Sequence, residues 1–254
     1  TRQFFRFTIP TILSMVAFSL YTLVDGIFVA KGVGETALAA VNLSSPYNSV
    51  MFAAGLLLAV GMSTTIAIRL GNGKHHEASS LFTRNLIVAV VVSIVISVLT
   101  LLNLRSVAQF LGAEGDTLGY VMEYVGGVSP FAVFFICSYN MEILVKTDGT
   151  PLLSTIGVSL AGVTNLVLDW LFVMIFHWGV RGAAVATGLA QVVSTVLYLY
   201  YFAKRSKQLH FVKVSLKPSE FKIYRRTLPL GVADSITEMS NGVVLFAFNQ
   251  TILR

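Results

Sequence analysis

The chain has 254 residues, of which 55% are hydrophobic and only 12% are charged, and its mean hydropathy is +0.77. Soluble domains carry about 25% charged residues, so this composition excludes an ordinary soluble globular protein. The formal net charge is +6 and the pI is about 9.5, which alone would suit a nucleic-acid-binding protein. The positions of the basic residues instead favour a membrane protein with no nucleic-acid partner.

Apolar segments follow one another along the whole chain and are predicted to be membrane-spanning helices. The run 85–104 holds no charged residue, and twenty residues at about 1.5 Å each span the roughly 30 Å core of a bilayer. Helices are expected because lipid offers no hydrogen-bond partner to an open backbone. The stretches between the segments, including 32–45 and 105–117, are predicted to be loops. The predicted segments are 4–30, 46–70, 81–104, 120–145, 152–176, 180–203 and 227–253.

The basic residues predict the orientation of these helices. With the N-terminus inside, fourteen Lys and Arg residues lie inside and four lie outside; the four are Lys31, Arg105, Arg181 and Arg254. The positive-inside rule then predicts a multi-pass protein of the cell (inner or plasma) membrane with a cytoplasmic N-terminus. The same basic residues suit contact with anionic lipids.

A weak internal repeat predicts how the chain is organised. The first segment opens FRFTIPTIL and the seventh opens YRRTLPLGV, so Pro10 and Pro229 occupy matching positions. Parallel repeats of this kind are typical of transporters. We therefore predict a six-helix lobe over 1–203, a basic cytoplasmic linker over 204–226, and over 227–254 the first helix of a truncated second lobe, whose remainder would be a partner of this one.

Polar side chains in three of the predicted helices lie at matching depth. Counted from the outer end of each helix, Asp25 lies about 9 Å inward, Asp169 about 12 Å and Thr187 about 9 Å, with Asn165 one turn from Asp169. Such oxygen donors suit a hard cation, and two nearby carboxylates without a cation tend to share a proton. The alternative is that each group bonds only a neighbouring helix backbone.

Two glutamates within the segments have different predicted environments. Glu142 lies four residues before Lys146, the favourable order for an ion pair, and we expect a solvated pair at the interface. Glu238 lies roughly 18 Å beyond Arg226 at helical rise. With Asp234 one turn earlier, it predicts a polar face and an aqueous cavity, where Glu238 is a possible proton site.

The ordered set of motifs resembles the MATE family, the multidrug and toxic compound extrusion transporters, over the N-terminal half of such proteins. The motifs are VDGIFVAKGVGETALAAV, GMSTTIAIRLGNGKHHEA, KTDGTP, NLVLD and GVRGAAVATGLA. The resemblance implies an all-α, twelve-helix antiporter of two six-helix lobes that exports cationic, amphipathic compounds, driven by Na⁺ or H⁺ entry and without another cofactor. It places the cation site on Asp25, Asn165, Asp169 and Thr187, and in some members adds an acidic residue that falls on Glu238. The chain holds no second lobe and alone is not expected to transport.

Three other classes share some of these features. A lipid-linked-sugar flippase would have the same architecture, and it is the alternative function. An intramembrane aspartyl hydrolase could also use two buried aspartates, but its GxGD motif is missing, because Asp25 follows TLV and Asp169 follows LVL; no enzyme is therefore expected. A seven-helix receptor would have an outside N-terminus, contrary to the charge count.

Overall fold

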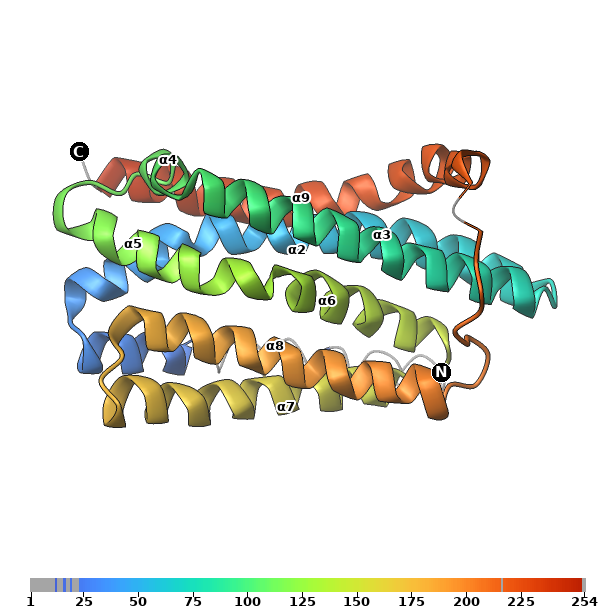
Figure 1. Cartoon of the computed structure of the whole chain (residues 1–254), viewed down its shortest axis with the longest axis horizontal. Coiled ribbons are helices and arrows are strands. Elements are labelled where there is room, and N and C mark those ends of the chain that lie inside the picture. The colour runs from blue at the N-terminus through green and yellow to red at the C-terminus, as the bar shows by residue number, and fades with distance from the viewer. Residues whose placement is uncertain (1–11, 13–15, 17–18, 20–22, 216, 253–254) are drawn as a thin grey trace.

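The computed structural model describes residues 12, 16, 19, 23–215 and 217–252 (Figure 1). Within this part the regular structure is entirely helical, as the apolar segments predict. Residues 23–32 form the helix that precedes α2. The helices that follow are α2 (Glu35–Gly71), α3 (His75–Leu102), α4 (Leu104–Phe110), α5 (Gly115–Val128), α6 (Ala132–Thr147), α7 (Pro151–Asp169), α8 (Gly179–Lys204) and α9 (Tyr224–Ile252), with three short helices, η1 (Ser129–Phe131), η2 (Trp170–Ile175) and η3 (Pro218–Ile223).

Five helical stretches in the described part are long and apolar enough to cross a bilayer. They correspond to the second to sixth predicted segments. The first predicted segment, 4–30, and its Pro10 lie mostly or wholly outside the described residues. The five stretches are Glu35–Gly71, His75–Leu102, Gly115–Thr147, Pro151–Ile175 and Gly179–Lys204.

The predicted loop 32–45 is wrong over most of its length, because α2 already begins at Glu35. The real break is Gly34, whose φ of 128° is a backbone conformation that favours glycine. The stretch after it is rich in Ala and Leu, which are strong helix formers, and Pro46 is accommodated inside α2. The predicted loop 105–117 likewise contains most of α4.

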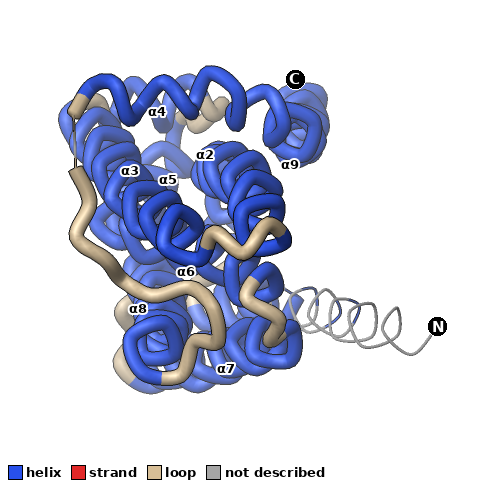
Figure 2. Tube along the Cα trace, turned by 90° about the vertical axis from the view of Figure 1, so that its right-hand side faces the viewer, coloured by secondary structure: helices blue, strands red, loops and turns tan. Residues whose placement is uncertain are grey.

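The long helices lie side by side in one elongated bundle (Figures 1 and 2). We call the end that carries the α2–α3 turn, the α6–α7 turn and residues 205–217 the linker end, and the other the opposite end. α9 runs along α2, where the Ser235 hydroxyl donates a hydrogen bond to the Ala53 carbonyl (3.1 Å). The backbone around Thr227 approaches Gly61 so closely that a Cβ there would meet the Thr227 carbonyl. Small residues thus allow the two helices to pack closely.

The helix pair α5 and α6 forms one spanning stretch broken in the middle by η1. Pro130 lies in η1 and interrupts the α-helical hydrogen bonds there. Neighbouring helices bond to this break, because the Ser97 hydroxyl donates to the Ser129 carbonyl (2.7 Å) and Tyr47 and Ser129 share a hydrogen bond between their hydroxyls (2.8 Å). The break is therefore a fixed kink, held by α2 and α3.

Residues 205–215, the described part of the linker between α8 and η3, pass along the flank of the bundle beside α3 (Figure 2). The fully buried carboxylate of Asp148, after the end of α6, accepts hydrogen bonds from three consecutive linker amides, those of Lys207 (2.8 Å), Gln208 (2.9 Å) and Leu209 (2.8 Å). The Tyr201 hydroxyl donates a fourth (2.6 Å). The KTDGTP motif therefore fixes the start of the linker to the linker end.

Two further contacts continue this attachment along α3. The Ser79 hydroxyl accepts a hydrogen bond from the His210 amide (3.2 Å), and the Thr83 hydroxyl accepts one from the Val212 amide (3.2 Å). Both hydroxyls lie on one face of α3, four residues apart. The linker is thus held in extended form as far as residue 212.

Candidate functional site

The last turn of α7 and the first half of α8 carry three of the polar residues singled out by depth. Asn165 and Asp169 lie one turn apart and are 1% and 0% exposed. The Asn165 amide donates to the Thr187 hydroxyl (3.3 Å), and that hydroxyl donates to the Ala183 carbonyl of its own helix (2.9 Å). Gly182 lies against Phe172 and Trp178, so the small residues of α8 allow it to pack closely on the end of α7.

Asp25 reaches the same place from the helix formed by residues 23–32. Its carboxyl group lies within electrostatic reach of that of Asp169. Among the described residues, no donor reaches either oxygen of Asp169, Oδ1 of Asp25 or Oδ1 of Asn165, although all four atoms are buried. Two ionised carboxylates cannot donate to each other, and their repulsion is strong in a medium of low dielectric constant. A proton or a cation between the two carboxylates would relieve this repulsion.

Two more side chains, Tyr124 of α5 and Asn48 of α2, complete the surroundings of these carboxylates. The Tyr124 ring is buried, and its hydroxyl lies next to Asn48 and Thr187 and within electrostatic reach of both aspartates. The buried Oδ1 of Asn48 has no donor among the described residues. Sequence reasoning missed both, because counting depth along a helix does not show which polar side chains face the two aspartates.

The backbone changes form immediately after Asp169. Residues Trp170–Ile175 form a π-helix, with the Phe176 amide donating to the Leu171 carbonyl (2.9 Å). Such wide turns occur mostly as single insertions in helices and often at functional sites. Asp169 is therefore the last residue before the helix widens, a position that sequence spacing alone does not reveal.

Glu142 and Glu238 lie elsewhere in the bundle. Glu142 forms the predicted ion pair with Lys146 (2.8 Å), but their side chains are only 14% and 27% exposed, so the expectation of a solvated pair is wrong. Glu142 lines a small internal cavity of about 40 Å³ with Ser138 and Gln191, and this packing removes the pair from water. Glu238 is half-buried on α9, within electrostatic reach of Tyr139.

The donors at the Asp169 site restrict what it can bind. In the part of the chain that the structure describes, no group of three or more His, Cys, Asp or Glu side chains is placed to hold a metal ion. The site instead offers the oxygens of two carboxylates, of amides and of hydroxyls, and several of these oxygens accept no hydrogen bond from the described residues. Oxygen donors of this kind fit a hard monovalent cation such as Na⁺, or a proton shared by the two carboxylates.

Comparison with known proteins supplies independent information. The MatE family model matches residues 10–171. Among curated proteins, the multidrug export protein MepA of Staphylococcus saprophyticus is 24% identical over 201 residues, which cover 79% of this chain and 45% of the relative. That of Staphylococcus haemolyticus is 25% identical over 215 residues, 85% of this chain and 48% of the relative. The chain thus spans about half the length of the curated relatives it matches.

Solved structures of MATE transporters also match this chain over about half of their length. A MATE protein crystallised in complex with MaL6 superimposes with a TM-score of 0.86 and 27% identity, over 96% of this chain and 54% of that chain. An outward-facing multidrug resistance transporter of the MATE family superimposes with a TM-score of 0.83 and 29% identity, over 95% and 53%. The helical arrangement described above is therefore that of about half of these transporters.

Proposed function

The chain belongs to the MatE family, as its motifs predict, and from this premise we propose that it forms part of a cation-coupled antiporter that exports cationic, amphipathic compounds by alternating access. The curated relatives are named as multidrug export proteins, and these names support export rather than the flippase alternative. The proposed coupling ion is Na⁺ or H⁺, and the proposed site consists of Asp25, Asn165, Asp169 and Thr187.

The observation that supports this proposal most strongly is the state of Asp169. Its carboxylate is fully buried within a helix of membrane-spanning length, has no donor among the described residues and adjoins a second carboxylate. An ionisable group there is unfavourable by about 2.5 to 3.5 kcal/mol on insertion scales. Such a residue is retained where charge must be taken up and released.

The four residues have distinct proposed tasks. Asp25 and Asp169 hold the ion or proton between them. Asn165, whose amide donates to the Thr187 hydroxyl, turns its Oδ1 toward the ion, and the Thr187 hydroxyl offers its second lone pair. Because Asp25 comes from a different helix from the other three, occupancy decides whether that helix is attracted to or repelled from α7. Cation and exported compound then need only favour different states for exchange to follow.

The linker end is proposed to be cytoplasmic, because most of the basic residues lie on the segments that meet there. The carboxylate site then opens toward the outer side of the cell membrane. A second lobe, comparable in size with this one, is the proposed partner with which the described helices enclose the path of the exported compound.

Efflux of a cationic dye by the full-length transporter that carries this chain tests the proposal. With an imposed sodium gradient in one arm and a proton gradient in the other, the wild type should respond to one of them. Asp169→Asn should reduce driven efflux at least tenfold, while Glu123→Gln, which removes an exposed carboxylate from α5, should retain it. Undiminished efflux by Asp169→Asn would contradict the proposal.

Binding of the cation can be measured separately from transport. Trp170 adjoins Asp169 and is about half exposed, and Trp178 is the other tryptophan of the chain. In a full-length transporter whose Trp178 and any tryptophan outside this chain are replaced by Phe, the fluorescence of Trp170 should change on addition of Na⁺ but not K⁺ if sodium couples, or on acidification alone if protons do. Either change should disappear in Asp169→Asn, and its persistence there would rule out this site.

A further inference from the structure

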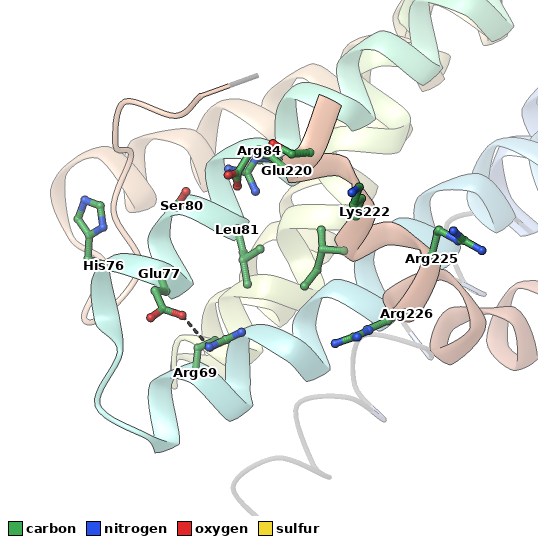
Figure 3. A pocket seen from close by; sticks show the side chains of 12 residues that line it. Arg69, His76, Glu77, Ser80, Leu81, Arg84, Glu220, Lys222, Arg225 and Arg226 are labelled. Carbon is green, nitrogen blue, oxygen red and sulfur yellow. Dashed lines mark ion pairs between the residues drawn. The ribbon is translucent and has the colours of Figure 1, made fainter. Parts of the chain in front are cut away.

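A large basic pocket of about 730 Å³ opens at the linker end, away from the carboxylate site (Figure 3). The end of α2, the start of α3, η3 and the first turn of α9 line it. Its cationic lining residues are Arg69, Arg84, Lys222, Arg225 and Arg226.

The charges in this pocket do not balance. Five cationic side chains meet two carboxylates, Glu77 and Glu220, which leaves an excess of three positive charges with His76 neutral. Glu77 is occupied by Arg69 (2.7 Å) and Lys74 (3.0 Å). For Lys222, Arg225 and Arg226, no ion pair is formed within the described residues. The pocket is therefore suited to an anion.

Arg84 makes the pocket more than a patch of solvated charge. Its side chain is 6% exposed and pairs through Nη2 with Glu220 (2.8 Å), whose own side chain is 45% exposed. Nε of Arg84 is buried and has no acceptor among the described residues. A buried guanidinium with an unused donor is unfavourable unless an acceptor reaches it, and the pocket is the space onto which this side chain opens.

Figure 3 shows where the charged side chains lie around the pocket. Arg84 and Glu220 meet at one side of the pocket, and Arg226 extends from α9 toward the part of α2 that carries Arg69. Guanidinium groups bind phosphate oxygens with several parallel N–H donors, a geometry that a single ammonium lacks. An anion with several oxygens, such as a phosphate ester, matches this arrangement.

An apolar groove of about 350 Å³ lies deeper between the same elements. On α3, Val88 of the groove lies one turn beyond Arg84, and in the short helix η3, Phe221 lines the groove while its neighbours Glu220 and Lys222 line the pocket. Leu228 of α9 also lines it. On a membrane-spanning bundle, a basic pocket that continues into an apolar groove matches the two parts of a phospholipid. The pocket suits the phosphate headgroup and the groove suits an acyl chain.

We propose that this pocket and groove bind one anionic phospholipid, with its phosphate at Arg84, Lys222 and Arg226 and one acyl chain along Val88 and Leu228. Basic pockets between membrane helices are known to hold anionic headgroups. Because η3 and α9 supply one wall, and α2 and α3 the other, the lipid fastens α9 to the bundle at the linker end.

Lipid adducts on the full-length transporter, released from mild detergent and counted by native mass spectrometry, test this proposal. Phosphatidylglycerol should bind in preference to phosphatidylcholine. The variant Lys222→Gln/Arg226→Gln should weaken phosphatidylglycerol binding about thirtyfold, since each basic residue at a membrane surface contributes about a factor of five. The control Lys213→Gln/Lys217→Gln removes two exposed linker charges outside the pocket and should change binding less than twofold.

Two further arms distinguish the source of the phosphate and the role of Arg84. Inorganic phosphate at millimolar concentration should not displace phosphatidylglycerol, because it lacks the acyl chain. Glu220→Gln frees Arg84 from its carboxylate and should tighten lipid binding severalfold. Equal loss in the control variant, displacement by inorganic phosphate, or no preference for phosphatidylglycerol would each overturn the proposal.

Discussion

Asp148 and Asp169 are both fully buried and lie close to the two ends of α7, yet their surroundings are opposite. Asp148, at the linker end, accepts four hydrogen bonds, three of them from consecutive backbone amides. Asp169, toward the opposite end, has none among the described residues and faces another carboxylate. A fully hydrogen-bonded carboxylate holds structure together, whereas one without donors needs a mobile ligand.

The largest effect on stability is expected from Asp148→Ala. The substitution leaves three amides and the Tyr201 hydroxyl without their acceptor. We expect a loss of about 3 kcal/mol in the free energy of unfolding, measured by thermal unfolding in detergent. Glu123→Ala, which removes an exposed carboxylate, is the control and should change little. Equal stability of wild type and Asp148→Ala would remove the contrast between the two aspartates.

Asp169→Asn should increase the stability of the protein, in contrast to Asp148→Ala. In buffer free of sodium at neutral pH, the wild type must keep two buried carboxyl groups together with only a shared proton, so replacing one of them by a neutral amide should raise the free energy of unfolding by about 1 to 2 kcal/mol. The same unfolding measurement reports it, and added Na⁺ should stabilise only the wild type if sodium is the ligand. A loss of stability as large as that of Asp148→Ala would mean that Asp169 is a structural residue too.

Tyr201→Phe sharpens the description of the Asp148 region. It removes one donor to the carboxylate, and the partner of the Thr150 hydroxyl (2.7 Å), but leaves the three linker amides in place. We expect a loss of about 1 kcal/mol. In the double variant with Asp148→Ala, this loss should not add to that of the single substitution, because the two act through one contact. Full additivity would show that the contact contributes little.

The smallest effect on stability is expected at the Glu142–Lys146 ion pair. Glu142 has neither the four hydrogen-bond donors of Asp148 nor the neighbouring carboxylate of Asp169. The two ends of the ion pair belong to one helix, four residues apart. Glu142→Gln keeps an amide oxygen that can accept from Lys146 and should lower the free energy of unfolding by only about 0.5 kcal/mol. Because a partly buried pair is screened weakly, raising potassium chloride during the unfolding measurement should change the difference little. A loss above 2 kcal/mol would place this pair with Asp148 as a structural centre.

Regular helical geometry explains what was predictable at the carboxylate site. Asp25, Asn165, Asp169 and Thr187 lie in helices whose rise per residue is constant, so counting from the helix ends places them at one depth. Counting gives no information on which neighbours face inward. For that reason Tyr124, whose hydroxyl lies beside Thr187, and the wide turn after Asp169 were not predicted.

The contacts of the linker end are less visible in the sequence because they join distant residues. Asp148 meets amides some sixty positions later in the chain, and no local pattern encodes that meeting. From the sequence, Arg84 is only one of the fourteen basic residues predicted on the cytoplasmic side. Its burial and its ion pair with Glu220 arise because η3 packs against α3. The start of α2 was misplaced because polar residues after Gly34 resemble a loop.

The attachment of the linker limits how far α9 can travel. Asp148, Ser79 and Thr83 hold the linker as far as residue 212, and five residues separate that point from η3, which begins at Pro218. Five extended residues reach at most about 17 Å. The hydroxyl of Thr83 therefore sets the length of the tether, and a rocking movement of α9 beyond that radius would have to detach the linker from Thr83, then from Ser79, and last from Asp148.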